Sequence, residues 1–473
     1  MTPPILQTCV TRPTFTAHWS ARTVTKTGVG RWTPIAPNRY LPDNNVVMDD
    51  ALARSLAQPA TLRLLDELTA RDLADPLRTV TALRGMGASS DIAAALSSLA
   101  ELRTTAELKL GHHATTMLLT RPGLEQATRW SVAALRARRF QVGGITAVAD
   151  LTCGLGVDAM ALAAAGLAVH AYELDPATAV FAAHNLAAYP RASVTAGDGR
   201  LADLSHVDAI YADPARRTGT GARINDPEQY LPALSEIWAL RDRVRLVGVK
   251  VGPGIAHRDI PPGATATWTS VDGDVVEATL WHGGNPDSTT DRTGGPWHEA
   301  TVAASDPEAP TTGRLRTTTI AGIPDGSHGA PPLQALSDVT ELGDFLLEPD
   351  GAVIRAHLLG MLGAISEQTD IQLVSPRIAY LSTSRPLPAR DGISLARAYR
   401  VLDVLPLNVK KLKQYLKQRN VGAITIKKRG VDLIPEVVRK QLGLRGENHA
   451  TVILTRIAGA HRAMMVEPME EVR

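Results

Sequence analysis

The chain has 473 residues, of which 44% are hydrophobic, and its formal net charge is +2 at pH 7. This length predicts two or three domains with sizeable cores, and the charge excludes a polycation, so nucleic-acid binding would need a local basic face. The two cysteines, Cys9 and Cys153, match neither a disulfide framework nor a zinc site, and no run of about 18 apolar residues predicts a membrane span. A reducing cytoplasm is the expected location.

The N-terminal part divides into an extension and a helical domain. Residues 1–47 are rich in Thr, Pro, Arg and Asn without sustained periodicity, so we expect a disordered extension or a short binding arm. Residues 48–140 are typical of helices, expected at 76–84, 90–102 and 123–140. The last helix carries a run of arginines that forms either a solvated face or contacts to phosphate, namely Arg129, Arg136, Arg138 and Arg139.

The stretch 148–175 has the pattern of strand, glycine turn, helix and strand. Its first apolar run ends at Asp150, Gly154 and Gly156 follow, and its second apolar run ends at Glu173. This is the first unit of a doubly wound α/β sheet, in which ligands bind at the carboxyl ends of the strands. The glycines let the backbone approach a ligand, and the acids are placed to accept hydrogen bonds from it.

The glycine loop also fits a loose dinucleotide fingerprint, but its charge favours another ligand. A pyrophosphate at the N-terminus of the helix would meet the carboxylates of Asp150 and Asp158. S-adenosylmethionine carries a sulfonium and an ammonium and no phosphate, so the loop predicts this cofactor. Acids that only cap the helix, and a nicotinamide dinucleotide, are the alternatives.

The next two strands of this domain, which we place at 141–283, also end in acids. A third strand reaches Asp198, which either receives an adenine amino group or is an ordinary turn acid. A fourth strand delivers Asp213 and then Pro214, a stiff turn that would fix a carboxylate beside the cofactor. Methyl transfer depends on orientation, so Asp213 is a candidate to hold the acceptor and to help remove its proton. An Asp-Pro turn without chemistry is the alternative.

Three more strands complete the expected sheet. The fifth, at 245–253, carries Lys250 late in its course. Two others are expected at 264–271 and 275–282, with a hairpin signal at Asp272-Gly273. A hairpin at the end of a mostly parallel sheet is compatible with a methyltransferase.

These motifs together resemble the class I S-adenosylmethionine-dependent methyltransferases. The likeness is greatest to bacterial proteins that join this domain to a C-terminal THUMP-like domain, and trimethylguanosine synthases are more distantly similar. The resemblance implies catalytic positions at Asp213 and Pro214, and Arg216, which follows them, is a further candidate catalytic residue. It implies a cofactor site made of Asp150, Thr152, Cys153, Gly154, Gly156, Asp158, Glu173, Leu174 and Asp198.

The sequence departs from the family pattern after the fourth strand. Amino-group methyltransferases typically continue Asp-Pro with a second proline and an aromatic residue, whereas Ala215 and Arg216 stand here. Methylation of a base nitrogen is therefore in doubt, and an arginine plane would stack on a base or clamp a phosphate instead. Cytosine C5 chemistry is disfavoured, because Cys153 belongs to the cofactor loop and no cysteine follows the fourth strand.

Residues 284–333 are rich in Gly, Thr, Asp, Ser and Pro, which indicates a linker or an insertion carrying up to two strands, near 299–304 and 315–321. The C-terminal region, 334–473, starts with an expected apolar helix at 352–365. It ends in a module at 395–460, in which strands and helices alternate.

The C-terminal module concentrates positive charge. Between Arg400 and Arg445 there are 12 Lys or Arg against 3 Asp or Glu, which predicts an RNA-binding face or, alternatively, only a well-solvated surface. The THUMP-like resemblance covers the same module. The candidate RNA contacts are Lys410, Lys411, Lys413, Lys417, Lys427, Lys428 and Arg429.

The expected architecture is α/β, with a Rossmann-like seven-stranded methyltransferase sheet between a helical N-terminal region and a small α+β THUMP-like domain. The expected function is S-adenosylmethionine-dependent methylation of RNA, either tRNA or rRNA, without a metal and without a membrane. A non-catalytic RNA-binding protein with a retained cofactor pocket and an NAD-dependent oxidoreductase are the alternatives.

Overall fold

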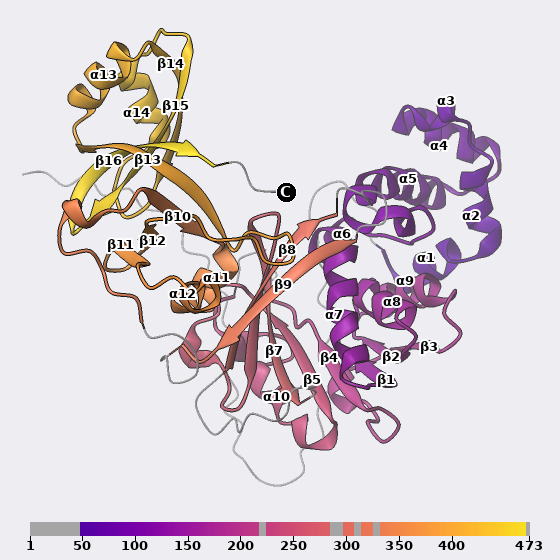
Figure 1. Cartoon of the computed structure of the whole chain (residues 1–473). Coiled ribbons are helices and arrows are strands. Elements are labelled where there is room, and N and C mark those ends of the chain that lie inside the picture. Colours follow the sequence, from indigo (N-terminus) through magenta and orange to yellow (C-terminus); the bar gives the residue numbers. More distant parts are fainter. Residues whose placement is uncertain (1–47, 217–223, 284–296, 307–313, 325–331, 470–473) are drawn as a thin grey trace, which may run out of the picture. The chain divides into compact units, whose positions relative to one another are not determined.

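The computed structural model describes residues 48–216, 224–283, 297–306, 314–324 and 332–469 (Figure 1). The expected extension at 1–47 lies outside these residues. The described residues contain two β-sheets, each covered by helices.

Helices dominate the N-terminal region, as the sequence predicts. Many begin at a side-chain cap: Asp49, Asp75 and Ser89 each accept a hydrogen bond from a backbone N–H of the first turn. The helix expected at 90–102 continues to Leu110. The helices are α1 Asp50–Leu56, α2 Pro59–Asp66, α3 Ala70–Leu73, α4 Pro76–Gly85, α5 Ser90–Leu110, α6 Arg121–Gln126 and α7 Trp130–Val142, with the 3₁₀ turn η1 Gly111–Thr115.

The single helix expected at 123–140 is two helices. Ala127 and Arg129 have ψ values of 146° and 138°, so the backbone is extended between α6 and α7. The break leaves Thr128 in a short connection, where it is buried. Its hydrogen-bond partners, Asp158 and Lys250, lie on a helix and a strand that are distant in sequence, which explains why helical periodicity gave no sign of it.

The first sheet has the strand order β3-β2-β1-β4-β5-β7-β6-β8-β9. β3, β2, β1, β4 and β5 run parallel, and β7 lies antiparallel between β5 and β6. The strands are β1 Ala147–Asp150, β2 Ala168–Glu173, β3 Ala192–Ala196, β4 Ala209–Ala212, β5 Leu246–Val251, β6 Thr265–Val271, β7 Asp274–Gly283, β8 Trp297–Ser305 and β9 Leu315–Gly322.

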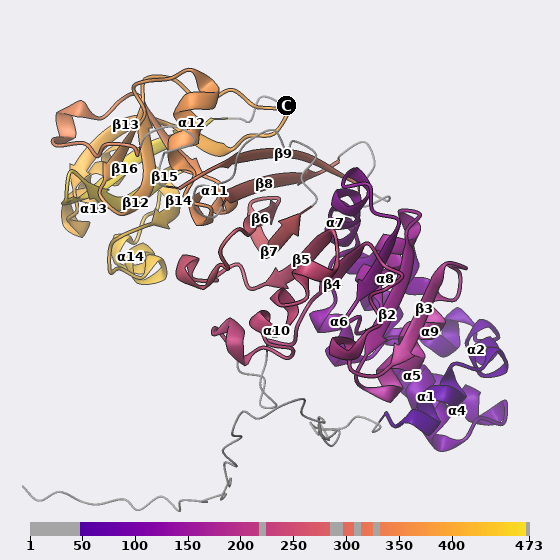
Figure 2. The ribbon, with the colours of Figure 1, turned by 90° about the horizontal axis from the view of Figure 1, so that it is seen from below.

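Both faces of the central strands β1, β4 and β5 are covered, so their residues are buried on both sides. Along β1, Val148 packs into one hydrophobic core and Ala149 into the other, following the two-residue period of a strand. Helices α8 Val157–Ala164 and α9 Pro176–Leu186 lie beside β2 and β3 (Figure 2). The opposite core includes α10 Leu234–Trp238. The carboxyl ends of the parallel strands are left to form a site.

The sheet has nine strands where the sequence predicts seven. β3 to β7 occupy the expected positions, and Asp272 and Gly273 have φ values of 52° and 89°, as a tight hairpin requires. The two additional strands, β8 and β9, come from the stretch 284–333, expected as a linker or an insertion. β8 pairs in parallel with β6, and its central residues are buried, because it covers what would otherwise be an open sheet edge.

The second sheet has seven strands in the order β11-β12-β10-β13-β16-β15-β14. The apolar helix expected at 352–365 is interrupted at His357, whose φ is 58°, so it forms two helices. The elements are β10 Phe345–Pro349, α11 Gly351–Arg355, α12 Leu359–Ser366, β11 Gln372–Ser375, β12 Ile378–Thr383, β13 Ala396–Pro406, α13 Val409–Gln418, β14 Val421–Lys428, α14 Pro435–Leu442, β15 Asn448–Ile457 and β16 Ala460–Pro468.

Helices α13 and α14 pack on the β14 side of this sheet through Leu412, Leu416, Val438 and Leu442. The expected alternation of strand and helix is therefore present, and β16 extends it past residue 460 to pair with β13 and β15. Short 3₁₀ turns complete the described structure: η2 Gly199–Leu201, η3 Pro227–Gln229, η4 Arg241–Arg243, η5 His257–Asp259 and η6 Val339–Glu341.

Candidate active site

A tight loop after β1 opens the site. Gly154 and Gly156 have φ values of 54° and 84°, in the left-handed region that favours glycine. A Cβ atom at Gly156 would lie 3.2 Å from the Leu186 side chain, so packing also requires glycine there. A Cβ atom at Gly154 would meet nothing within 4 Å, so this part of the backbone faces open space that a ligand can enter.

Asp150, at the end of β1, is fully buried. Its Oδ1 accepts a hydrogen bond from the Thr152 N–H at 3.2 Å, whereas Oδ2 has no partner among the described residues. Burial, reinforced by the Asp158 carboxylate, holds the pKa of Asp150 well above its ordinary value. A buried acceptor without a partner costs free energy, so this carboxylate fits a ligand that brings a cationic N–H donor.

Glu173, at the end of β2, holds the glycine loop from the other side. Its Oε2 accepts from the Gly154 N–H and its Oε1 from the Asp175 N–H, both at 2.9 Å. Burial raises the pKa of Glu173. Each oxygen has a further lone pair, which is suited to the hydroxyls of a ribose. Leu174 follows, with 55% of its surface exposed, and offers an apolar side chain at the same strand end.

Asp198 lies just after β3, as expected, but an arginine neutralises its charge. The Arg200 guanidinium lies 2.6 Å from its Oδ2, and this contact holds the pKa of Asp198 below its ordinary value. Arg200 also lies 3.0 Å from Glu236. The carboxylate therefore has a partner that the sequence did not indicate.

Asp158, in the first turn of α8, has both oxygens engaged. Oδ2 accepts a hydrogen bond from the Thr128 hydroxyl at 2.9 Å, and Oδ1 forms an ion pair with Arg136. Arg136 also contacts the Glu277 carboxylate at 2.5 Å. Burial alone would lower the pKa of Arg136, but the two carboxylates raise it well above its ordinary value. The charge argument for a cationic ligand therefore depends on Asp150 and Glu173.

Two arginines of α7 correct the expectation of a solvated face or a phosphate contact. Arg136 is buried and paired with Asp158 and Glu277. Arg139 lies 2.5 Å from the Glu299 carboxylate, with its guanidinium over the Trp281 ring. Strands β7 and β8 place these acids under the helix, so the arginines turn toward the sheet. Arg129 and Arg138 are exposed.

Asp213 follows β4 and is held from two neighbouring strands. Its N–H donates to the Thr152 hydroxyl oxygen at 2.7 Å, which ties it to the loop after β1. The Lys250 ammonium, on β5, donates to its Oδ2 at 2.6 Å. The Asp213 side chain is 23% exposed and the Lys250 side chain 7% exposed. A carboxylate thus stands at the site edge in a defined orientation.

The residues after Asp213 form a braced turn. Pro214 is buried, and Ala215 exchanges two backbone hydrogen bonds with Leu231, at 2.9 and 3.1 Å. A Cβ atom on Gly252 would lie 3.0 Å from a nitrogen of Arg216, so the guanidinium lies against the backbone at the end of β5. The turn therefore brings a cation to the same edge as Asp213.

Sequence reasoning did not assign Lys250 or Thr128 to the site. A lysine within the apolar strand Leu246–Val251 was the available signal for the first. No local pattern could reveal the second, because its partners lie on α8 and β5.

Burial raises the pKa of the Cys153 thiol well above its ordinary value, so this cysteine remains a thiol and is unsuited to act as a nucleophile.

The basic residues expected to contact RNA divide into two groups. Lys427 forms an ion pair with Glu348, Arg429 donates to a backbone carbonyl at 2.5 Å, and Lys413 donates to the Gln441 carbonyl at 3.0 Å. These three side chains are engaged within the C-terminal region, 334–473. The exposed basic side chains of α13, β14 and α14 are Lys410, Lys411, Lys417, Lys428, Arg439 and Lys440.

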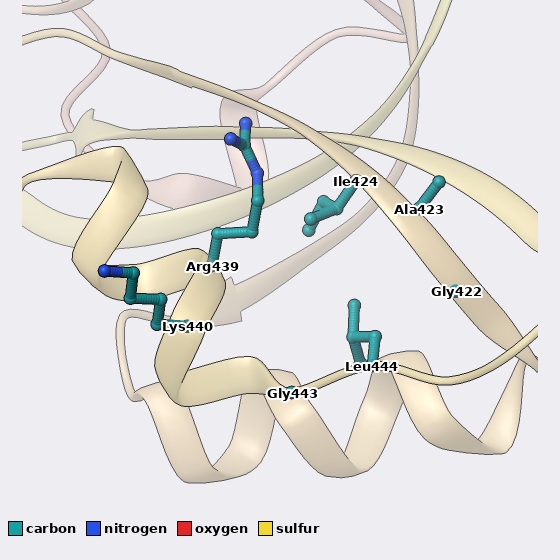
Figure 3. Close-up of a pocket in the computed structure, with 7 residues that line it drawn as sticks. All are labelled: Gly422, Ala423, Ile424, Arg439, Lys440, Gly443 and Leu444. Atoms are coloured by element: carbon teal, nitrogen blue, oxygen red, sulfur yellow. The ribbon is translucent and has the colours of Figure 1, made fainter.

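A cavity of about 490 Å³ adjoins α14 and β14. Figure 3 shows the Arg439 side chain extending over it from α14, with Ile424 and Leu444 at its apolar side. Its lining residues are Gly422, Ala423, Ile424, Arg439, Lys440, Gly443 and Leu444. The cavity combines apolar surface with positive charge.

No group of three or more His, Cys, Asp or Glu side chains is placed to hold a metal ion in the part of the chain that the structure describes. Across the same ranges, no helix combines the length and the apolar character that crossing a membrane requires.

Comparison with known proteins matches a family model to the C-terminal region and finds relatives over most of the chain. Residues 396–468 match the family model described as THUMP domain-like. Two Mycobacterium tuberculosis proteins, from strains CDC 1551 / Oshkosh and H37Rv, are each named as an uncharacterized S-adenosylmethionine-dependent methyltransferase. Each is 31% identical over 352 residues, covering 72% of this chain and 85% of the relative. A crystal structure from Porphyromonas gingivalis W83, described as a candidate methyltransferase, shares the fold, with a TM-score of 0.62, 19% identity and coverage of 89% of this chain and 97% of that one.

Proposed function

The chain belongs to the S-adenosylmethionine-dependent methyltransferases, and from that premise we propose that it transfers the methyl group of this cofactor to RNA. The curated relatives are named as methyltransferases that use S-adenosylmethionine, which removes the NAD-dependent oxidoreductase from consideration. The cytoplasmic location remains part of the proposal and depends on the cysteine content alone.

In this proposal, the ends of β1 and β2 hold the cofactor. The unpartnered Oδ2 of Asp150 accepts a hydrogen bond from the methionine ammonium, and Glu173 accepts from the ribose hydroxyls. Leu174 packs against the adenine, whose amino group donates to Asp198. Thr152, Cys153, Gly154, Gly156 and Asp158 shape the loop around the methionine. The cofactor supplies an electrophilic methyl group on a positively charged sulfur.

The proposed role of Asp213 is to orient the acceptor. Its Oδ2 receives the Lys250 ammonium, and its Oδ1 has no protein partner among the described residues. Oδ1 therefore accepts a hydrogen bond from an acceptor N–H or O–H and takes up the proton that the acceptor loses. Pro214 stiffens the turn, and Arg216 stacks on a base or binds a phosphate of the same substrate.

RNA is proposed as the substrate because of the THUMP-like domain at 396–468, with tRNA or rRNA as the leading classes. The domain matches a THUMP-like family model and exposes lysines along α13. In this proposal Lys410, Lys411, Lys417 and Lys428, which are exposed, neutralise phosphates of the RNA. Lys413, Lys427 and Arg429 would first have to give up their contacts within the protein. The cavity beside Arg439 combines apolar surface with positive charge, and that charge supports contact with a phosphate of the RNA (Figure 3).

One observation carries the proposal. Asp150, a buried carboxylate whose Oδ2 has no partner among the described residues, and Asp213, a carboxylate held by a lysine, lie at the ends of adjacent strands of one sheet. The test is incubation of the purified protein with methyl-labelled cofactor and total RNA from cells that lack the gene, followed by mass spectrometry of nucleosides. We expect one labelled nucleoside, which Asp213→Ala abolishes while cofactor affinity remains nearly unchanged. Tight cofactor binding without label in any RNA would instead support a non-catalytic RNA-binding protein.

A further inference from the structure

Lys250 is a charged residue in the middle of the sheet. It lies on β5, every residue of which is buried, between β4 and β7. Its ammonium donates to Asp213 Oδ2 at 2.6 Å and to the Thr128 hydroxyl oxygen at 2.9 Å. Burying an ammonium is costly unless it is paired and hydrogen-bonded, so these two contacts account for a lysine at this position.

Thr128 connects this lysine to the cofactor loop. Its hydroxyl carries a single proton, which it donates to Asp158 Oδ2 at 2.9 Å, so toward Lys250 the same oxygen acts only as an acceptor. A directed chain of hydrogen bonds therefore runs from Lys250 through Thr128 to Asp158 on α8. Thr128 is available because the chain is extended between α6 and α7, so the N-terminal helical region completes this network.

We propose that Lys250, together with Thr128, is a positioning residue for methyl transfer. Lys250 holds one oxygen of Asp213 and fixes the direction of the other toward the acceptor, while Thr128 ties this arrangement to the helix that follows the cofactor loop. This inference depends on the proposed function of Asp213. It adds to that function the groups that set the distance between acceptor and methyl donor.

The exposed fractions of the Asp213 and Lys250 side chains separate the roles of these two residues. Asp213 is 23% exposed and reaches the substrate side, whereas Lys250 is 7% exposed and acts behind it. In-line transfer is sensitive to small displacements, and a misplacement of about 1 Å can cost about 100-fold in rate. An unheld carboxylate on a quarter-exposed side chain has rotamers that point away from the acceptor.

The test compares single-turnover methyl transfer to the RNA pool with calorimetric binding of S-adenosylmethionine. Lys250→Met keeps the apolar stem and removes the charge, and we expect it to lower the transfer rate about 100-fold with a nearly unchanged cofactor Kd. Thr128→Val, which keeps the shape and removes the hydroxyl, should lower the rate by a smaller factor. Arg139→Met is the matched control. It breaks the ion pair between Arg139 on α7 and Glu299 on β8 of the same sheet, and it should leave the transfer rate unchanged.

A double variant distinguishes positioning from stability. If Lys250 acts through Asp213, then Lys250→Met combined with Asp213→Asn transfers methyl groups no more slowly than Asp213→Asn alone. Additive losses, or a parallel loss of rate and cofactor affinity in Lys250→Met, would overturn the inference. Full activity in Asp213→Asn would instead refute the proposed function, and full activity in Lys250→Met alone would refute only this inference.

A structural measurement covers the case in which no RNA is labelled. Crystal structures of the unaltered protein and of Lys250→Met, each with S-adenosylmethionine, should show the Asp213 carboxylate rotated in the variant. The same Asp213 rotamer in both structures would contradict the positioning role of Lys250 whatever the acceptor is.

Discussion

Replacing Arg136 with Met tests how the protein supports the helix that follows the cofactor loop. The Arg136 side chain is 4% exposed, and its two partners, Glu277 and Asp158, are 5% and 12% exposed. The substitution keeps an apolar stem but leaves both carboxylates buried without their cation. Removing one member of a buried ion pair costs about 3–5 kcal/mol. The Thr128 and Thr279 hydroxyls still donate to these acids, so we expect the lower part of this range.

Urea unfolding of the purified variant measures this loss as a lower free energy of unfolding with an unchanged m-value. Arg138→Met is the control, since Arg138 is exposed on the same helix and its removal should change the free energy by no more than about 0.5 kcal/mol. Adding Asp158→Asn and Glu277→Gln to Arg136→Met should recover part of the stability. A loss below about 1 kcal/mol for Arg136→Met, the value of an exposed pair, would refute the reasoning.

Three further outcomes follow from the same contacts. Glu173→Gln should weaken S-adenosylmethionine binding about tenfold in calorimetry, because one charge-assisted acceptor is lost. The ionised form of Asp150 binds an ammonium and its pKa is raised by burial, so cofactor affinity should rise with pH through that raised pKa. Asp150→Asn should therefore flatten the pH dependence of cofactor affinity and weaken cofactor binding at neutral pH. Ionised Asp150 also destabilises the free protein, so the same substitution should raise the melting temperature of the free protein. Replacing Lys410, Lys411 and Lys417 with Ala should reduce the slope of log affinity for RNA against log salt by about 2 in filter binding, and an unchanged slope would show that these lysines do not meet phosphate.

Much of the first sheet could be predicted because β1, β2, β3 and β4 each end at or next to an acidic residue that the sequence shows. Asp150, Glu173 and Asp213 lie at strand ends as the sequence indicates, and Gly154 and Gly156 adopt the positive φ values that only glycine adopts easily. These features depend on residues close in sequence. The roles of these acids in binding and catalysis remain predictions.

The features that sequence reasoning missed depend on residues distant in sequence. Arg136 and Glu277 are 141 positions apart, and nothing around the arginine distinguishes it from the exposed Arg138. Lys250 and Thr128 are 122 positions apart, and the helix break that buries Thr128 lies within an otherwise helical pattern. Strands near β8 and β9 were expected within a linker or an insertion, but the pairing of β8 with β6, and of β9 with β8, depends on an open sheet edge that only the folded sheet presents.

A structure of the protein with bound S-adenosylmethionine tests the central claim most directly. The claim is that buried carboxylates at the ends of β1 and β2 hold the cofactor so that its methyl group faces Asp213. We predict the methionine ammonium within hydrogen-bond distance of Asp150 Oδ2, the ribose on Glu173 and the methyl group directed at Asp213. A cofactor bound with its adenine at Asp150, or with its methyl group directed away from Asp213, would contradict the account.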